Sequence, residues 1–153
     1  MMCKLQNNHQ IIQSMNKILI VILVYFFSTN LFAKDNINYF EKGEEHYNKK
    51  NIEKAKLNFE KDIVRNTKNI KSYLYLAKIH KDKNNSEEFE KNLKTVLILD
   101  PKNEEALYLL IIKKVKDADY DFATEKYKIF SKYCSKLCSK KNEIGRLIKK
   151  SKS

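Results

Sequence analysis

Apolar residues in the middle of the chain recur every three or four positions, which is the spacing of one face of an α-helix. Between Ile70 and Asn103 this pattern occurs twice, separated by a short polar stretch around Asn85. Asn85 followed by Glu88 is typical of the capping box that begins a helix, and Pro101 ends the second pattern because proline cannot continue the hydrogen-bond ladder. The segment therefore predicts two antiparallel helices joined by a turn.

The same pattern recurs 34 residues away in both directions, so that small, packing and capping residues fall in register. The aligned positions are Gly43, Ala77 and Ile111; Ala55, Phe89 and Ala123; Phe59, Leu93 and Tyr127; and the capping residues Asn51, Asn85 and Asp119. A helical hairpin cannot bury its apolar face alone, so hairpins at this period stack on their neighbours. The predicted helices are 39–49, 52–65, 71–83, 87–99, 104–117 and 120–133.

These positions resemble the tetratricopeptide repeat (TPR) family, whose motif is W-x2-L-G-x2-Y, then A-x3-F, then P. The middle unit matches as Tyr73-x2-Leu76-Ala77-x2-His80, Phe89-x3-Leu93 and Pro101. Thr67 and Ser135 stand in the proline position of the other two units. The resemblance implies an all-α fold, a right-handed α-solenoid with repeats at 36–69, 70–103 and 104–137.

The segment after the third unit continues the register. Ile144 and Gly145 fall in the positions of Leu76 and Ala77, and Ile148 falls in that of His80. Repeat arrays need an end unit with a polar outer face. We therefore expect a C-terminal capping helix within residues 138–150 and a short tail at 151–153.

The N-terminal segment has the pattern of a signal peptide. Residues 18–27 are an unbroken apolar run preceded by Lys17, and Leu31-Phe32-Ala33 offers a cleavage position. The run is shorter than a membrane span requires. We expect a signal peptide at 1–33 (with Met15 as an alternative start), a linker at 34–38, and a periplasmic or secreted protein. The alternative is an inner-membrane anchor formed by residues 18–33.

The charge is unevenly distributed. The chain has 31 Lys and Arg against 19 Asp and Glu, a net charge of +12. From Ser131 onward there are eight basic residues against Glu143 alone. A basic segment of this kind indicates either the solvated face of an end helix or peripheral contact with an anionic membrane. The same charge supports the alternative function of binding nucleic acid or an anionic membrane surface.

The cysteines and histidines have both structural and functional interpretations. Cys134 and Cys138 flank the turn before the predicted capping helix, where they could form a disulfide in an oxidising compartment or remain two reduced thiols. His46 and His80 occupy equivalent positions, which allows a shared metal, but core packing explains both. No cofactor, metal site or catalytic motif is predicted, so we expect no enzyme activity.

In the TPR family the first helices of the repeats line a concave groove that binds peptides, and the resemblance implies the same role here. The corresponding residues are Phe40, Tyr47, Lys71, Leu74, Lys78, Lys81, Tyr108 and Ile112. Aromatic and aliphatic anchors surrounded by lysines favour a partner peptide or helix that is apolar with acidic flanks. The expected function is therefore a non-catalytic protein–protein interaction module, an exported adaptor or scaffold.

Overall fold

The computed structural model describes residues 17, 19, 22 and 37–152. The chain divides into two units, Met1–Ile37 and Asn38–Ser153. The predicted signal peptide, its cleavage position and linker residues 34–36 lie outside the described residues, apart from Lys17, Leu19 and Ile22. Among the described residues, no helix has the length and apolarity needed to cross a membrane.

The described part of the second unit is all-α, as predicted. Its helices are α2 (Tyr39–Asn48), α3 (Ile52–Arg65), α4 (Ile70–Asp82), α5 (Ser86–Leu99), α6 (Glu104–Lys116), α7 (Tyr120–Tyr133) and α8 (Lys141–Lys152), with a 3₁₀ turn, η2 (Cys138–Lys140). The six helices predicted from the 34-residue pattern agree with α2–α7 within one residue at each end. The predicted 138–150 segment divides into η2 and α8.

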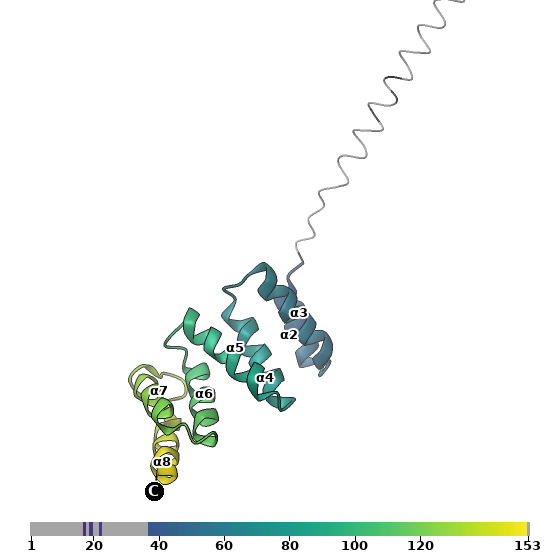
Figure 1. Ribbon diagram of the computed structural model, residues 1–153. Coiled ribbons are helices and arrows are strands. Elements are labelled where there is room, and N and C mark those ends of the chain that lie inside the picture. The colour runs from purple at the N-terminus through teal and green to yellow at the C-terminus, as the bar shows by residue number, and fades with distance from the viewer. Residues whose placement is uncertain (1–16, 18, 20–21, 23–36, 153) are drawn as a thin grey trace, which may run out of the picture. The chain divides into compact units, whose positions relative to one another are not determined.

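Consecutive helices pack against one another in sequence order (Figure 1). We call α2 with α3, α4 with α5, and α6 with α7 the first, second and third helix pairs. The second helix of each pair also contacts the first helix of the next pair, and α8 packs against both α7 and α6. This arrangement is compatible with a helical-repeat protein.

The turn inside each pair has the same geometry. Lys50, Asn84 and Ala118 have φ of 60°, 57° and 60° and lie 34 residues apart. The next residue of each turn donates its backbone N–H to a carbonyl of the preceding helix, at 2.9 Å in every case. Glycine is the usual residue in this left-handed conformation, and this chain uses other residues at all three positions.

The predicted capping residues all precede second helices, and two of the three act through their side chains. Asn85 accepts a hydrogen bond from the N–H of Glu88 at 3.2 Å, and Asp119 accepts one from Phe122 at 3.4 Å. Asn51 makes no such bond. The reciprocal half of the predicted capping box is wrong, because the N–H of Asn85 donates to the His80 carbonyl at 2.9 Å, while the Glu88 carboxylate pairs with Lys91.

Three apolar clusters follow one another along the helix pairs. The first contains Ala55, Phe59, Leu76 and Ile79; the second contains Ala77, Phe89, Leu93, Val96, Ala106 and Leu110; the third contains Leu107, Ile111, Ala123, Phe130, Ile144 and Ile148. The first two clusters each join residues of neighbouring pairs, so each pair is stabilised by the next. The third cluster holds α8 through Ile144 and Ile148.

Candidate functional site

A cleft lies between the C-terminal end of α4, the turn that follows it, and the part of α6 from Tyr108 to Lys116. We call it the α4–α6 cleft; its volume is about 320 Å³. Its lining residues are Lys81, Asn84, Ser86, Phe89, Tyr108, Leu109, Ile112, Lys113, Lys116 and Asp117. Tyr108, Leu109 and Ile112 are only half-buried, so an apolar surface is open to a ligand in this cleft.

The charge of the cleft is basic, and two of its lysines are available. Lys81 and Lys116 are exposed, and within residues 37–152 neither forms an ion pair. Lys113 is already paired with Asp117 and lies 3.9 Å from Glu90. An anionic group that enters the cleft would therefore meet Lys81 and Lys116 first, one from each of two helices.

Three of the eight predicted groove residues, Lys81, Tyr108 and Ile112, line this cleft. Lys78 lies one turn before Lys81, but its Nζ is 2.8 Å from Glu105 Oε1 and 5.3 Å from the centre of the Tyr75 ring. Its charge therefore links α4 to α6 within the chain. An exposed ion pair of this kind contributes at most about 1 kcal/mol, so it remains open to competition from a ligand carboxylate.

Phe40 and Tyr47, which sequence analysis assigned to the groove, belong to an aromatic cluster between the first two helix pairs. The rings of Phe59 and Tyr75 stack at a centroid distance of 4.7 Å. Tyr47 meets Tyr75 edge-on at 5.0 Å, and Phe40 lies 6.0 Å from Phe59. Both predicted anchors are half-buried in this cluster, so packing between pairs occupies much of their surface.

The hydroxyl of Tyr75 is fixed at this same junction. It donates a hydrogen bond to Glu44 Oε1 at 2.9 Å, which joins α4 to α2. Burial and then the bond to Glu44 raise the pKa of Tyr75 to about 12. The hydroxyl therefore stays protonated and keeps its role as a donor at neutral pH.

The remaining predicted groove residues also have contacts inside the chain. Leu74 packs against the second apolar cluster, and Lys71 Nζ lies 5.6 Å from the centre of the Phe40 ring. Lys71 is exposed, so it shares the surface of the first helices with Lys81. Five of the eight predicted residues thus lie outside the α4–α6 cleft, on the surface formed by α2 and α4.

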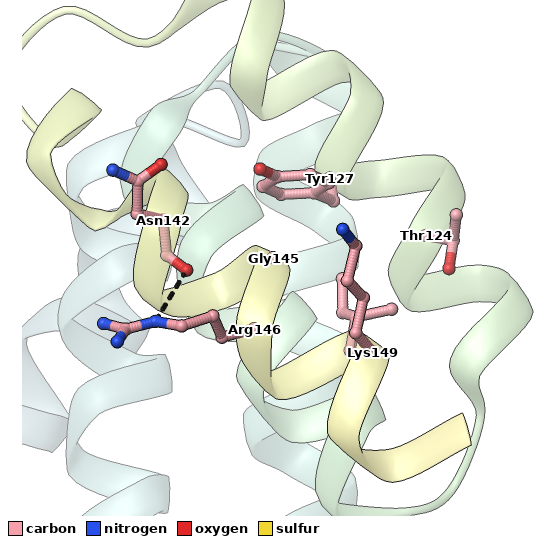
Figure 2. Close-up of a pocket in the computed structure, with 7 residues that line it drawn as sticks. Thr124, Tyr127, Asn142, Gly145, Arg146 and Lys149 are labelled. Atoms are coloured by element: carbon pink, nitrogen blue, oxygen red, sulfur yellow. Dashed lines mark hydrogen bonds between the residues drawn. The ribbon is translucent and has the colours of Figure 1, made fainter. Parts of the chain in front are cut away.

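A second cleft, the α7–α8 cleft, lies where the last helix meets the third pair and has a volume of about 890 Å³. Its lining residues are Thr124, Tyr127, Asn142, Gly145, Arg146, Ile148 and Lys149. Figure 2 shows Tyr127 of α7 beside Gly145, with Lys149 between α8 and Thr124. The Tyr127 hydroxyl donates to the Lys141 carbonyl at 3.2 Å, which fixes the start of α8 against α7.

The turn between α7 and η2 positions α8. The Cys134 and Cys138 sulfurs lie 2.11 Å apart, a bonding distance, and their Cα atoms are separated by 5.2 Å. The N–H groups of Ser135, Lys136 and Leu137 all donate to the Glu104 carboxylate, at 2.8–3.1 Å. Burial alone would raise the pKa of Glu104, but these backbone donors outweigh it, so the pKa lies below its usual value.

The two histidines in equivalent positions have different surroundings. His80 is buried, and its Nδ1 has no hydrogen-bond partner among the described residues. Burial, followed by the charge of Lys56, lowers the pKa of His80 below its usual value. His46 is half-buried. Within the described residues, no group of three or more histidine, cysteine or acidic side chains is placed to hold a metal.

Sequence reasoning missed Asn84, Phe89 and Lys113 as parts of the α4–α6 cleft. Leu109, Lys113 and Lys116 lie three or four residues apart, so the helical period placed them on one face. The missing information was that this face of α6 meets the turn at Asn84. That contact depends on how neighbouring pairs pack, which the 34-residue period alone does not specify.

Comparison of the sequence with protein-family models finds no match. Comparison with curated proteins likewise finds no similar sequence. Any functional assignment therefore depends on the geometry and chemistry of the two clefts.

Proposed function

We propose that this chain is a TPR-type right-handed α-solenoid that acts as a non-catalytic adaptor. The recurrence at 34 residues supports the family, since the turn conformation at Lys50, Asn84 and Ala118 repeats at the same interval. Packing of each helix pair against the next supports the solenoid. In such an array the first helices α2, α4 and α6 would form the inner, ligand-binding surface.

The proposed activity is to bind a partner segment that is apolar with acidic flanks. One observation carries it: the half-buried Tyr108, Leu109 and Ile112 lie in a cleft together with the unpaired Lys81 and Lys116. Aromatic anchors supply much of the binding energy of small interfaces, and flanking charges guide encounter. The proposal extends along α4 to Lys71 and Lys78, which would meet further carboxylates.

The proposal includes export. The apolar run at 18–27 and the sequence Leu31-Phe32-Ala33 support a signal peptide. A disulfide between Cys134 and Cys138 would suit an oxidising compartment. N-terminal sequencing of the exported protein is expected to begin at Lys34. An intact N-terminus in a membrane fraction would instead assign residues 18–33 to an anchor.

The test of the adaptor role is site-specific photo-cross-linking in the cells that produce the protein. A photoreactive residue at Lys116 is expected to capture a segment with apolar residues and acidic flanks. The control carries the same residue at Val64, which is 79% exposed and lines neither cleft. A synthetic peptide of the captured segment then serves as the ligand for quantitative binding.

Two variants separate anchoring from charge. Tyr108→Ala is expected to weaken peptide binding by about 2 kcal/mol, mainly through faster dissociation. Lys81→Glu with Lys116→Glu is expected to slow association and reduce its salt dependence. Lys54→Glu with Lys68→Glu, at exposed positions outside both clefts, is the charge-matched control. Full affinity in both cleft variants, with folding intact by circular dichroism, would exclude this cleft as the site.

The alternative function, nucleic-acid binding, predicts a different response to salt and to the charge variants. Nucleic-acid binding would be strongly salt-dependent and would fall with each lysine removed, regardless of position. The cleft and control double variants would then weaken binding equally. Peptide binding at the α4–α6 cleft predicts that only the cleft variant has an effect.

A further inference from the structure

Helix α8 occupies the position of a first helix, but among the described residues no second helix covers it. Ile144 and Ile148 are buried against α6 and α7 in the third apolar cluster. The opposite side of α8 is exposed at Arg146, Leu147, Lys149 and Lys150. In the three helix pairs, the second helix packs against the corresponding first helix.

The first pair shows what covers the equivalent position. Gly43 is buried, and a Cβ built on it would lie 2.6 Å from Phe59 Cε1, so the ring of Phe59 rests directly on the glycine backbone. Gly145 lies 102 residues later, three periods on. It is half-exposed, and the nearest atom to its hypothetical Cβ is the Tyr127 hydroxyl oxygen at 3.0 Å. The α7–α8 cleft is thus open where Phe59 closes the first pair.

The charged residues that line this opening are both basic. Arg146 and Lys149 line the cleft, and the Arg146 Nε donates only to the Asn142 carbonyl, at 3.4 Å, among the described residues (Figure 2). Lys149 forms no ion pair within residues 37–152. The single acidic residue of α8, Glu143, is already paired with Lys140 at 2.9 Å. The opening therefore favours a ligand that carries carboxylates.

We propose that the α7–α8 cleft docks an acidic amphipathic helix of a partner protein. The docked helix takes the place of a second helix for α8. It places an aromatic side chain over Gly145, as Phe59 lies over Gly43, and its carboxylates face Arg146 and Lys149. Leu147, 38% exposed, lines a different hollow on α8 and is not part of this site. This site is separate from the α4–α6 cleft, so the two proposals fail independently.

The probe is a peptide built from the helix that covers Gly43. It has the 14-residue sequence of α3, Ile52–Arg65, with its basic residues Lys54, Lys56, Lys61 and Arg65 replaced by glutamate. The unmodified α3 peptide and an acidic peptide with Phe59→Ala are the two reference ligands. Fluorescence anisotropy of the labelled peptides measures their affinity for the folded protein.

Two protein variants block the site by different means. Gly145→Leu fills the opening from within, and Arg146→Glu with Lys149→Glu reverses its charge at exposed positions that do not support the core. Circular dichroism checks that both remain helical. Lys54→Glu with Lys68→Glu carries the same charge change outside both clefts, and Lys81→Glu with Lys116→Glu tests the other cleft.

The expected result is saturable binding of the acidic peptide, weakened on the order of tenfold or more by either α8 variant and unchanged by either control. The acidic Phe59→Ala peptide and the unmodified α3 peptide should also bind on the order of tenfold more weakly than the acidic peptide. Equal binding of the acidic peptide with and without Phe59 would overturn the proposal, as would equal loss in the charge-matched control. A third outcome would also overturn the proposal: the protein binds phosphatidylglycerol vesicles but not the peptide, and Arg146→Glu with Lys149→Glu abolishes the vesicle binding. That result would assign this face of α8 to a membrane.

Discussion

The two glycines of this protein occupy equivalent positions in the 34-residue pattern but have different surroundings. Gly43, in α2, is buried beneath the Phe59 ring of its own second helix. Gly145, in α8, is half-exposed, and only the end of Tyr127 from the preceding pair approaches it. The first pair is therefore closed at this position, whereas the last helix is open.

The difference shows what a repeat position does and does not specify. A glycine in this column permits close approach of another side chain, because no Cβ stands in the way. It does not determine whether the approaching group comes from the same hairpin, from a neighbour or from another molecule. At Gly43 the fully buried Phe59 fills the space, and at Gly145 the space remains as part of a cleft.

The largest expected effect tests whether α8 is a structural part of the array. Deletion of residues 142–153 removes Ile144 and Ile148 and exposes the apolar surface of Ile111 and Phe130. Loss of two buried isoleucine side chains predicts about 4 kcal/mol of destabilisation. Urea unfolding measures it, with deletion of residues 151–153 alone as the control. An unchanged midpoint would mean that α8 does not stabilise the third pair.

The second prediction compares the glycines directly. Gly43→Ala is expected to destabilise the protein by about 1–2 kcal/mol, because overpacking against Phe59 exceeds the helix propensity that alanine gains. Gly145→Ala is expected to be neutral or stabilising by up to about 1 kcal/mol, since the Tyr127 hydroxyl end can move aside. Thermal melts of both variants decide this. Equal destabilisation by both would show that Gly145 is as tightly covered as Gly43.

The third prediction concerns the disulfide in the turn that precedes α8. Replacing Cys134 and Cys138 by alanine is expected to cost roughly 1–2 kcal/mol, the low end for disulfides because the closed loop is short. Reductant should lower the stability of the natural chain and leave the double variant unchanged. Alkylation with and without reductant, followed by mass spectrometry, checks the thiols in protein freshly isolated from the cells that produce it. Two free thiols there would contradict the bridge.

The fourth prediction uses the turns inside the pairs as an internal reference, since these turns are alike. Ala118→Gly is expected to stabilise the protein by about 0.5–1 kcal/mol, because glycine adopts a φ of 60° without a Cβ penalty. Asn84→Gly should gain less, since asparagine tolerates this conformation better than alanine does. Chemical unfolding measures both. Destabilisation by Ala118→Gly would show that this turn is not held in the left-handed region.

Much of the fold was predictable because the periodic signals are local. Apolar spacing gave the helices α2–α7 to within a residue, and Asn85 and Asp119 were recognised as caps. Side-chain partners across pairs were not predictable. The position of Lys78 suggested a free groove lysine, yet it pairs with Glu105 from the next pair.

The candidate site shows the same limit. Periodicity placed Lys81, Tyr108 and Ile112 on first helices, and the structure brings all three to one cleft. Periodicity also placed Phe40 in the same column as Tyr108. In the structure, however, the Phe40 ring packs with the rings of Phe59 and Tyr75 in an aromatic cluster. Phe40 and Tyr108 are both half-buried, yet they have different neighbours because the side chains packed beside them differ.

The turns that connect one helix pair to the next differ in how they are held, and this difference leads to the prediction with the smallest expected effect. The first two end in Asn69 and Asn103, whose side chains accept a hydrogen bond from the first turn of the next helix. Leu137 stands at the third such position and offers no oxygen, and the Glu104 carboxylate binds this turn instead through three backbone donors. At the other two junctions, the carboxylates of Asp62 and Asp100 accept hydrogen bonds from the side chains of Asn69 and Asn103. The turn before α8 is instead positioned by the charge of Glu104.

That charge makes a pH-dependent prediction. The folded pKa of Glu104 is lowered, so its contribution to stability is complete above the unfolded value of about 4.3 and is lost as the pH falls toward the folded pKa. Glu104→Gln should cost at most about 1 kcal/mol at pH 7, because the carboxylate is at the surface. The difference between the two proteins should shrink as the pH falls below about 4.3. Urea midpoints from pH 7 to pH 3 measure it, with Glu87→Gln, exposed in the first turn of α5, as the charge-matched control. If Glu104→Gln and Glu87→Gln follow the same pH curve, the carboxylate does not hold the turn before α8, and the orientation of Gly145 must depend on Tyr127 and the disulfide alone.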